Sequence, residues 1–235
     1  MGRVIILFGF CTAGKSTIIR YFKNKYDDNC LRTIDTDAEI SKEYGNHIYN
    51  IYTSFYKDMP SYKKDGRSEY NNKDANEYIE KKEREILVKL TDECFESDIP
   101  YLIAPGPFLV TRKPQWEYFY YNIKPICYYL ELTPEKVYKG LKIRIEKLKC
   151  NKISKSISFG CWDDGSITKY ESGKYIMLPE EIALQNIKKH MKKPTGKYKE
   201  FSDSKRTFSA IEIKNDYDLE NKLYKSIEKD LLLKL

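Results

Sequence analysis

Residues 9–17 of the chain have the types and the spacing that suit binding of a nucleotide phosphate. They read GFCTAGKST, which matches the pattern G-x-x-x-x-G-K-[ST] without a gap. Gly9 and Gly14 are predicted to adopt backbone angles that a Cβ would block, so that successive N–H groups point inward around an anion. The residues predicted to contact the nucleotide are Gly9, Cys11, Thr12, Ala13, Gly14, Lys15, Ser16 and Thr17.

The polar residues of this motif, a phosphate-binding P-loop, each have a chemical task. The ammonium group of Lys15 is predicted to reach the β- and γ-phosphates, and the hydroxyl of Ser16 to hold Mg²⁺. Thr17 supplies a second hydroxyl beside it. A helix that begins near Lys15 adds the positive end of its dipole at the same place. The motif therefore predicts ATP and Mg²⁺ as cofactors.

A P-loop site also needs an acidic residue, and the strand that usually supplies it does not do so in this chain. The third expected strand, Tyr101 to Ala104, ends without a carboxylate, and no Asp lies three residues before any Gly in the chain. Switch-type GTPases and motor-type ATPases are therefore disfavoured. Asp35 and Asp37 follow the second expected strand, whose end faces the same crevice as the P-loop in a parallel sheet.

The two carboxylates are predicted to have different roles. Asp37 is predicted to activate the hydroxyl group of an acceptor, and Asp35 to lie on the Mg²⁺ side. These roles are interchangeable on sequence alone, and Asp37 alternatively serves only as the N-cap of the next helix. The predicted reaction is transfer of the γ-phosphoryl group of ATP to a small acceptor.

Alternating strands and helices are needed to bring these residues together. Strands are expected at residues 3–8, 31–34, 100–104, 126–132 and 210–213, and helices at 15–25, 76–97, 133–149 and 219–235. This order predicts a single domain with a three-layer α/β P-loop fold and a five-stranded parallel sheet. Residues 46–75 are expected to form an irregular insertion, and residues 150–197 a lid with little regular order.

The overall composition limits the partners. The net charge of +7 suits anionic ligands, but no dense basic block is interleaved with aromatics, so no nucleic acid is expected. No apolar run approaches the ~20 residues that cross a membrane, and no membrane partner is expected. Scattered Cys without a C-x-x-C pair disfavour a zinc site and favour a cytoplasmic location. The expected partner is a small-molecule acceptor.

Together these residues resemble the shikimate kinase group of small P-loop kinases. The resemblance begins at residues 9–17 and continues through Ile34–Ile40, where Asp35-Thr36-Asp37 is similar to the D-x-D of that family. The other similar segments are Ser41–Ile51, Pro105–Pro107, Tyr128–Glu135 and Met191–Phe201. The resemblance implies a small-molecule kinase that uses ATP and Mg²⁺. It also implies that Arg84 contacts the acceptor and that Gly106 lines the acceptor site.

Several positions differ from the family pattern. Gly106 stands alone where the family has a glycine triplet, and Lys199 stands where the family has a second substrate-binding Arg. Lysine does not reproduce the bidentate clamp of Arg on a carboxylate, so shikimate is not the expected acceptor. Arg84 is alternatively a solvated surface residue, and Gly106 a structural turn. Lys139 and Arg144 either approach the nucleotide or belong to a charged face.

Two other functions stay open. A nucleoside or nucleotide kinase would use the same motif with a different acceptor. A non-catalytic nucleotide-binding module that acts on a protein partner is the alternative outside enzymes, and the Tyr-rich insertion at 46–75 favours it. Turnover of ATP with a small hydroxyl compound separates an enzyme from such a module.

Overall fold

The computed structural model describes residues 2–45, 73–106, 113–150, 167–171, 174–202, 206–209 and 217–232. Its strands are β1 (Val4–Gly9), β2 (Arg32–Asp35), β3 (Tyr101–Ala104), β4 (Ile126–Glu131), β5 (Thr168–Glu171), β6 (Lys174–Met177) and β7 (Thr207–Ser209). Its helices are α1 (Lys15–Lys25), α2 (Thr36–Tyr44), α4 (Lys73–Glu96), α5 (Lys113–Ile123), α6 (Pro134–Cys150), α7 (Glu180–Phe201) and α8 (Tyr217–Leu231). Most of the predicted insertion, and the first part of the predicted lid, lie outside the described residues.

The main sheet is parallel, with the strand order β2-β3-β1-β4-β7. The central strand β1 pairs with β3 and β4, β2 flanks β3 on one side, and β7 flanks β4 on the other. Asp35 at the end of β2 lies opposite Ala104 at the end of β3. The carboxyl ends of these strands therefore meet at one edge of the sheet. This arrangement confirms the predicted α/β fold with a five-stranded parallel sheet.

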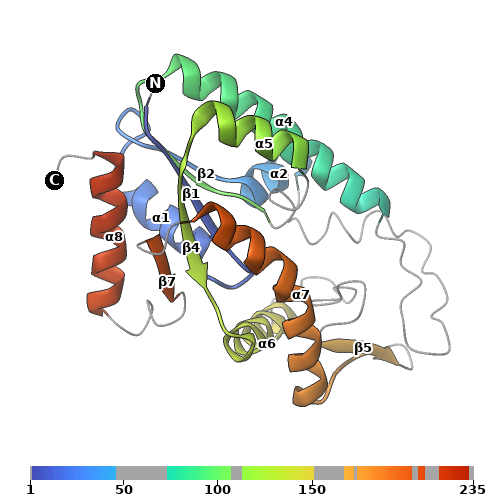
Figure 1. The fold of residues 1–235 in the computed structure, drawn as a ribbon. Coiled ribbons are helices and arrows are strands. Elements are labelled where there is room, and N and C mark those ends of the chain that lie inside the picture. Colours follow the sequence, from blue (N-terminus) through green and yellow to red (C-terminus); the bar gives the residue numbers. More distant parts are fainter. Residues whose placement is uncertain are drawn as a thin grey trace.

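Helices cover both faces of the sheet, so β1 is buried throughout (Figure 1). Successive side chains of a strand point to opposite faces. Ile5 and Leu7 pack with residues of α1 and α8 on one side. Ile6 and Phe8 pack with residues of α4 and α5 on the other. Phe8 also stacks on Tyr198 of α7, with ring centroids 5.3 Å apart, whereas Ala183, Ile187 and Met191 of the same helix pack with the first cluster. The uninterrupted apolar run of β1 follows from this burial on both faces.

Helices α5 and α7 were not predicted from the sequence. Helix α5 occupies a stretch for which no helix is expected, and it packs beside α4. Trp116, Phe119 and Ile123 are its buried side chains, and their spacing of three and four residues is helical. The tyrosines between these positions, including the exposed Tyr118 and Tyr121, obscure that period in the sequence.

The predicted lid contains more regular structure than expected. The prediction that residues 150–197 have little order is wrong in part, because the antiparallel pair β5–β6 and most of α7 fall within them. Helix α7 forms because Ala183, Ile187 and Met191 repeat at intervals of four residues and pack into the core. The fifth strand of the sheet is β7, whereas the strand predicted at residues 210–213 lies outside the described residues.

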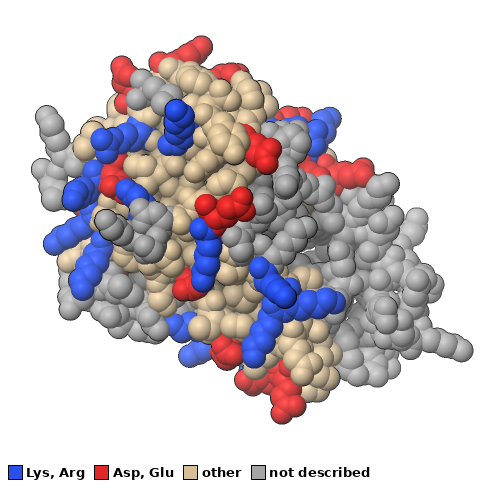
Figure 2. All heavy atoms as spheres, in the orientation of Figure 1, with Lys and Arg blue, Asp and Glu red and all other residues tan. Residues whose placement is uncertain are grey.

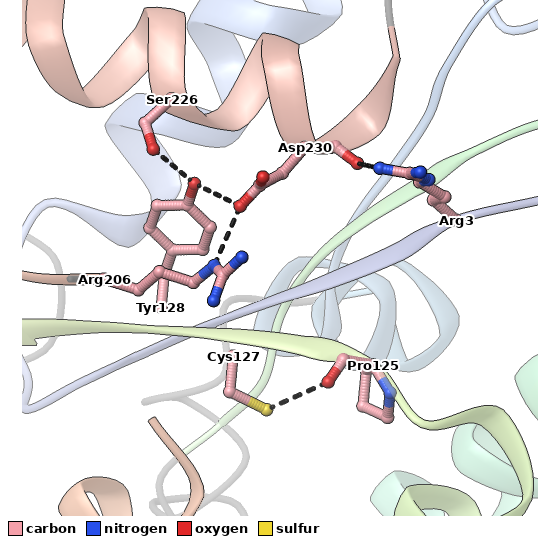
Figure 3. Close-up of polar contacts among 7 residues, drawn as sticks. All are labelled: Arg3, Pro125, Cys127, Tyr128, Arg206, Ser226 and Asp230. Carbon is pink, nitrogen blue, oxygen red and sulfur yellow. Dashed lines mark hydrogen bonds and ion pairs between the residues drawn. The ribbon is translucent and has the colours of Figure 1, made fainter. Parts of the chain in front are cut away.

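A cluster of hydrogen-bonded polar residues connects α8 to the sheet (Figure 3). The hydroxyl of Tyr128 donates to Oδ2 of Asp230 at 2.9 Å and is hydrogen-bonded to Oγ of Ser226 at 2.7 Å. Arg206 donates to the same carboxylate at 2.8 Å, and Arg3 donates to the backbone oxygen of Asp230 at 3.0 Å. Burial by itself raises the pKa of Asp230, but the bonds from Arg206 and Tyr128 outweigh it and hold that pKa below its usual value.

The face of the molecule drawn in Figure 2 carries charges of both signs. Basic side chains gather along the left edge and in the lower part of this view, and acidic side chains lie between and beside them. Within the part of the chain that the structure describes, no helix combines the length and the apolar character needed to traverse a bilayer.

Candidate nucleotide and acceptor site

The P-loop connects β1 to α1 at the carboxyl edge of the sheet. Gly14 has a left-handed backbone (φ 90°, ψ 8°), and its carbonyl accepts bonds from the N–H groups of Thr17 and Ile18 at 2.9 and 3.1 Å. Thr12 is also left-handed, with φ 72°. Left-handed residues at such positions turn the N–H groups of a loop toward a common centre, which binds anions. The first turn of α1 contains no acidic residue that would repel a phosphate.

The two glycines of the motif are required for different reasons. The left-handed angle of Gly14 confirms the prediction made for it. Gly9 is the last residue of β1 and has no positive φ, so the same prediction for Gly9 is wrong. A Cβ at Gly9 would lie 2.9 Å from Cβ of Ala13 and 3.1 Å from the backbone oxygen of Leu130. Gly9 is therefore needed because the loop and β4 approach it closely.

The P-loop carries one ammonium and two hydroxyl groups, which are the kinds of group that hold a phosphate and a metal ion. The ammonium of Lys15 donates to the backbone oxygen of Gly9 at 2.7 Å, which holds the side chain across the loop. Ser16 and Thr17 are exposed on the first turn of α1. Among the described residues, no group of three His, Cys, Asp or Glu side chains could hold a metal ion. Mg²⁺ needs few protein ligands when the phosphates of a nucleotide supply the others.

Asp35 and Asp37 both lie where β2 leads into α2, but they differ in role. Asp35 is the N-cap of α2, and its carboxylate accepts a bond from the N–H of Ala38 at 3.4 Å. The alternative that Asp37 is the N-cap is therefore wrong. Asp37 is half-buried in the first turn of α2, and its backbone oxygen accepts a bond from Oγ of Ser41 at 2.6 Å.

Gly106, directly after β3, is the point where three elements converge. Its N–H donates to Oγ1 of the fully buried Thr36 at 2.7 Å, which ties the loop to α2. A Cβ at Gly106 would lie 2.7 Å from Oδ1 of Asp37 and would overlap the carboxylate of Glu83 on α4. Glu83 is only 3% exposed. Glycine at this position therefore preserves the space where the two carboxylates approach each other.

Thr36 and Glu83 were not predicted from the sequence to belong to the site. A signal for Glu83 was nevertheless present, because it falls on the apolar face of α4, four residues from both Ile79 and Leu87. A charged residue in line with core positions is unusual unless it has a partner or a function. Thr36 offered no comparable signal, because its bond to Gly106 joins segments that are distant in the sequence.

The other predicted residues lie in different surroundings. Arg84 is exposed on α4, next to Glu83 in the sequence, and its contact with an acceptor stays a prediction. Lys199 forms an ion pair with Glu131 at 2.6 Å, and this bond raises the pKa of the Lys199 ammonium. Lys139 is exposed on α6. Arg144 also belongs to α6, but its side chain is outside the described part of the structure.

Several solved structures share the fold of this chain. A shikimate kinase from Bacteroides thetaiotaomicron has a TM-score of 0.54 and 16% identity, over 99% of this chain and all of its own. A shikimate kinase from Acinetobacter baumannii in complex with shikimate has a TM-score of 0.55 and 16% identity, over 100% of this chain and 96% of its own. A shikimate kinase from Aquifex aeolicus has a TM-score of 0.50 and 14% identity, over 97% and 95%. The chain has the shikimate kinase fold.

This fold is shared despite little similarity of sequence. No family model and no curated protein matches the chain. At 14–16% identity, what is common to the shikimate kinases and this chain is the course of the backbone. The chemistry of the site therefore has to be argued from the residues of this chain.

Proposed function

We propose that the protein is an ATP-dependent kinase that transfers the γ-phosphoryl group to a hydroxyl group of a small molecule. The observation that carries this proposal is that the P-loop, Asp37 and Gly106 lie at the carboxyl edge of one parallel sheet. Ligands of open α/β sheets bind in the crevice at this edge. The fold of the shikimate kinases, which is also the fold of this chain, supports the same class of reaction.

In the proposed mechanism the P-loop N–H groups and Lys15 bind the phosphates, for which Lys15 leaves the backbone oxygen of Gly9. Ser16 and Asp35 would hold Mg²⁺, which neutralises charge on the transferring phosphoryl group. Asp37 orients the acceptor hydroxyl and accepts its proton as the hydroxyl oxygen bonds to the γ-phosphorus. The bond from that phosphorus to the bridging oxygen breaks, and ADP leaves.

We also propose that the acceptor carries no carboxylate beside Gly106, and so is not shikimate. Asp37 and Glu83 approach each other there. A pair of carboxylates that is ionised only accepts hydrogen bonds, so in that state Asp37 and Glu83 match hydroxyl or ammonium groups of a ligand. A ligand carboxylate at the same place would face like charges, which is costly. Lys199 does not relieve this cost in the present geometry, because it is paired with Glu131.

An assay of ADP release tests the proposed function. Purified protein would be supplied with ATP and Mg²⁺ and a panel of sugars, polyols, nucleosides and shikimate-like acids. ADP release that depends on one hydroxyl compound supports the proposed small-molecule kinase. ADP release with nucleosides alone identifies a nucleoside kinase. Binding of ATP without release for any compound supports the non-catalytic module instead. The variant Lys15→Ala is the control for activity that originates at the P-loop.

We propose a cytoplasmic location for this activity. Cys30, Cys94 and Cys127 are not joined in disulfides, which is the usual state of thiols in a reducing compartment. Measurement of the protein's distribution by cell fractionation tests this proposal.

A further inference from the structure

Thr12 of the P-loop has an unfavourable conformation. Its φ of 72° lies in the left-handed region, which β-branched residues rarely enter. Its Oγ1 is buried and makes no hydrogen bond within the described part of the chain. Both features cost free energy, and such outliers persist only where the surrounding structure holds them. Some other part of the fold must therefore hold Thr12.

Helix α6 supplies that support at Gly140. A Cβ on Gly140 would lie 2.7 Å from both Cβ and Oγ1 of Thr12, and 3.0 Å from its Cγ2. The side chain of Thr12 therefore occupies the notch that glycine leaves in the surface of α6. Glycine is a poorer helix former than alanine, so its presence inside α6 calls for such a packing reason.

The loop is thus packed on two sides. On one side the buried Ala13 lies against Gly9, and on the other the half-buried Thr12 lies against Gly140. These contacts act on the two residues that precede Gly14 in the anion-binding loop, where the N–H of Ala13 also donates to the backbone oxygen of Phe10 at 3.2 Å. A shift of Thr12 out of the left-handed region would turn its peptide groups away from the common centre.

We propose that Gly140 is a positioning residue of the nucleotide site and that it acts through Thr12. The proposal rests on the proposed function, in which the ligand of the loop is the phosphate chain of ATP. The notch at Gly140 keeps Thr12 left-handed, and Thr12 together with Gly14 directs the N–H groups to the phosphates. Helix α6 thereby controls the affinity for the nucleotide through the shape of the loop.

A double-mutant cycle tests this coupling. The affinity for ATP with Mg²⁺ would be measured by calorimetry for wild type, Gly140→Ala, Thr12→Gly and the double variant. Gly140→Ala is expected to weaken binding about tenfold or more in the wild-type background, but only about twofold or less when residue 12 is glycine. Lys142→Ala, an exposed substitution on the same helix, is expected to leave binding unchanged.

The thermal midpoint of each variant without nucleotide separates positioning from general packing. A role in packing alone would lower the midpoint of Gly140→Ala while the folded protein kept its affinity, and that result overturns the proposal. Equal weakening in both backgrounds overturns it as well. Failure of the proposed function is distinguishable, because it is seen as absent ADP release in wild type, whereas the cycle measures binding alone.

Discussion

Lys15 and Asp37 come from different elements, and backbone bonds already restrain both before any ligand binds. Lys15 is held on the backbone oxygen of Gly9, and the backbone of Asp37 is bonded to Ser41. In the proposed mechanism Lys15 exchanges this bond for one to phosphate, whereas the bond from Ser41 holds the backbone of the helical turn that carries the Asp37 carboxylate. The chemistry of the site should therefore be sensitive to single substitutions that leave the fold unchanged.

The first prediction concerns the charge of Lys15. Lys15→Ala should fold normally but bind ATP with Mg²⁺ about 10- to 100-fold more weakly, because a charge-assisted bond to phosphate is lost. Calorimetry measures the affinity, and circular dichroism the fold. Lys23→Ala, an exposed substitution in the last turn of the same helix, is the matched control and should behave as wild type. Undiminished phosphoryl transfer by Lys15→Ala would contradict the role proposed for Lys15 and the P-loop.

The second prediction separates the two aspartates. Asp37→Asn should keep nucleotide binding but lose about 100-fold or more in kcat, the usual contribution of a positioned general base. Asp35→Asn is an informative companion, because Asn is also a good N-cap, so the variant removes the charge and spares α2. Asp35→Asn should change the dependence of the rate on Mg²⁺ concentration. If Asp35→Asn loses most of its kcat while Asp37→Asn keeps nearly the kcat of wild type, the two roles are exchanged.

Among the elements, helices α6 and α8 both pack against the part of the fold that carries the P-loop. Helix α6 contacts the loop at Thr12 through Gly140, and α8 makes a few specific contacts with α1 and the sheet. Helix α8 packs on α1, where the rings of Tyr21 and Tyr224 stack with centroids 4.1 Å apart. At the same interface Lys25 donates to the buried Glu228 at 2.5 Å, and this bond raises the pKa of Lys25 to about 12. The cluster around Asp230 joins α8 to the sheet. These contacts make α8 part of the scaffold behind the nucleotide site.

The third prediction concerns the pH dependence of this scaffold. Because the pKa of Asp230 is lower in the folded than in the unfolded protein, its stabilising effect is present above the unfolded value of about 3.9. The effect is lost as the pH falls through the folded pKa. Asp230→Asn should therefore be less stable than wild type at pH 7, and its stability should fall less on acidification. Urea titrations from pH 7 to pH 3 measure both quantities.

A second variant separates the ion pair from the hydroxyl bond. Tyr128→Phe preserves the packed ring and the bond between Arg206 and Asp230, and it should cost about 1 kcal/mol at pH 7. Acid profiles that are the same for wild type and Asp230→Asn would contradict the assignment of the acid-sensitive stability to this carboxylate.

For the whole molecule, the acceptor side is assembled from segments that are far apart along the chain. Asp37 comes from α2, Glu83 from α4, and Gly106 from the end of β3. The bond from Gly106 to Thr36 fixes two of these segments to each other. Only the folded sheet brings their polar groups together, so the preference for an acceptor is a property of the tertiary structure.

The fourth prediction is that shikimate is a poor acceptor. Its kcat/KM should fall below about 10⁴ M⁻¹s⁻¹, the lower end of the usual range for enzymes, while ATP still binds. An ADP-release assay with millimolar shikimate measures this. An analogue with a hydroxymethyl group in place of the carboxylate is the matched compound and should be the better acceptor. Efficient turnover of shikimate would contradict the role proposed here for Asp37 and Glu83.

The sequence by itself determined the P-loop, the sheet and the approach of Asp35 and Asp37 to its edge. The P-loop is local, because consecutive residues form it, and the parallel direction of the strands places the ends of β1 and β2 at the same edge of the sheet, on either side of β3. Apolar runs and helical periods located most of the elements that carry these residues. Conformations set by packing were not predictable in this way, as the strand geometry of Gly9 shows.

Contacts between distant segments were decided only by the tertiary structure. Adjacent residues of a helix point about 100° apart, so the packing of α4 determines that Glu83, and not its neighbour Arg84, lies against Gly106. The fit of Thr12 into the notch at Gly140 likewise depends on where α6 crosses the P-loop. The helical period indicates that Glu83 is buried, but the partner in each contact has no local signature, because two surfaces approach closely that the chain brings together only on folding.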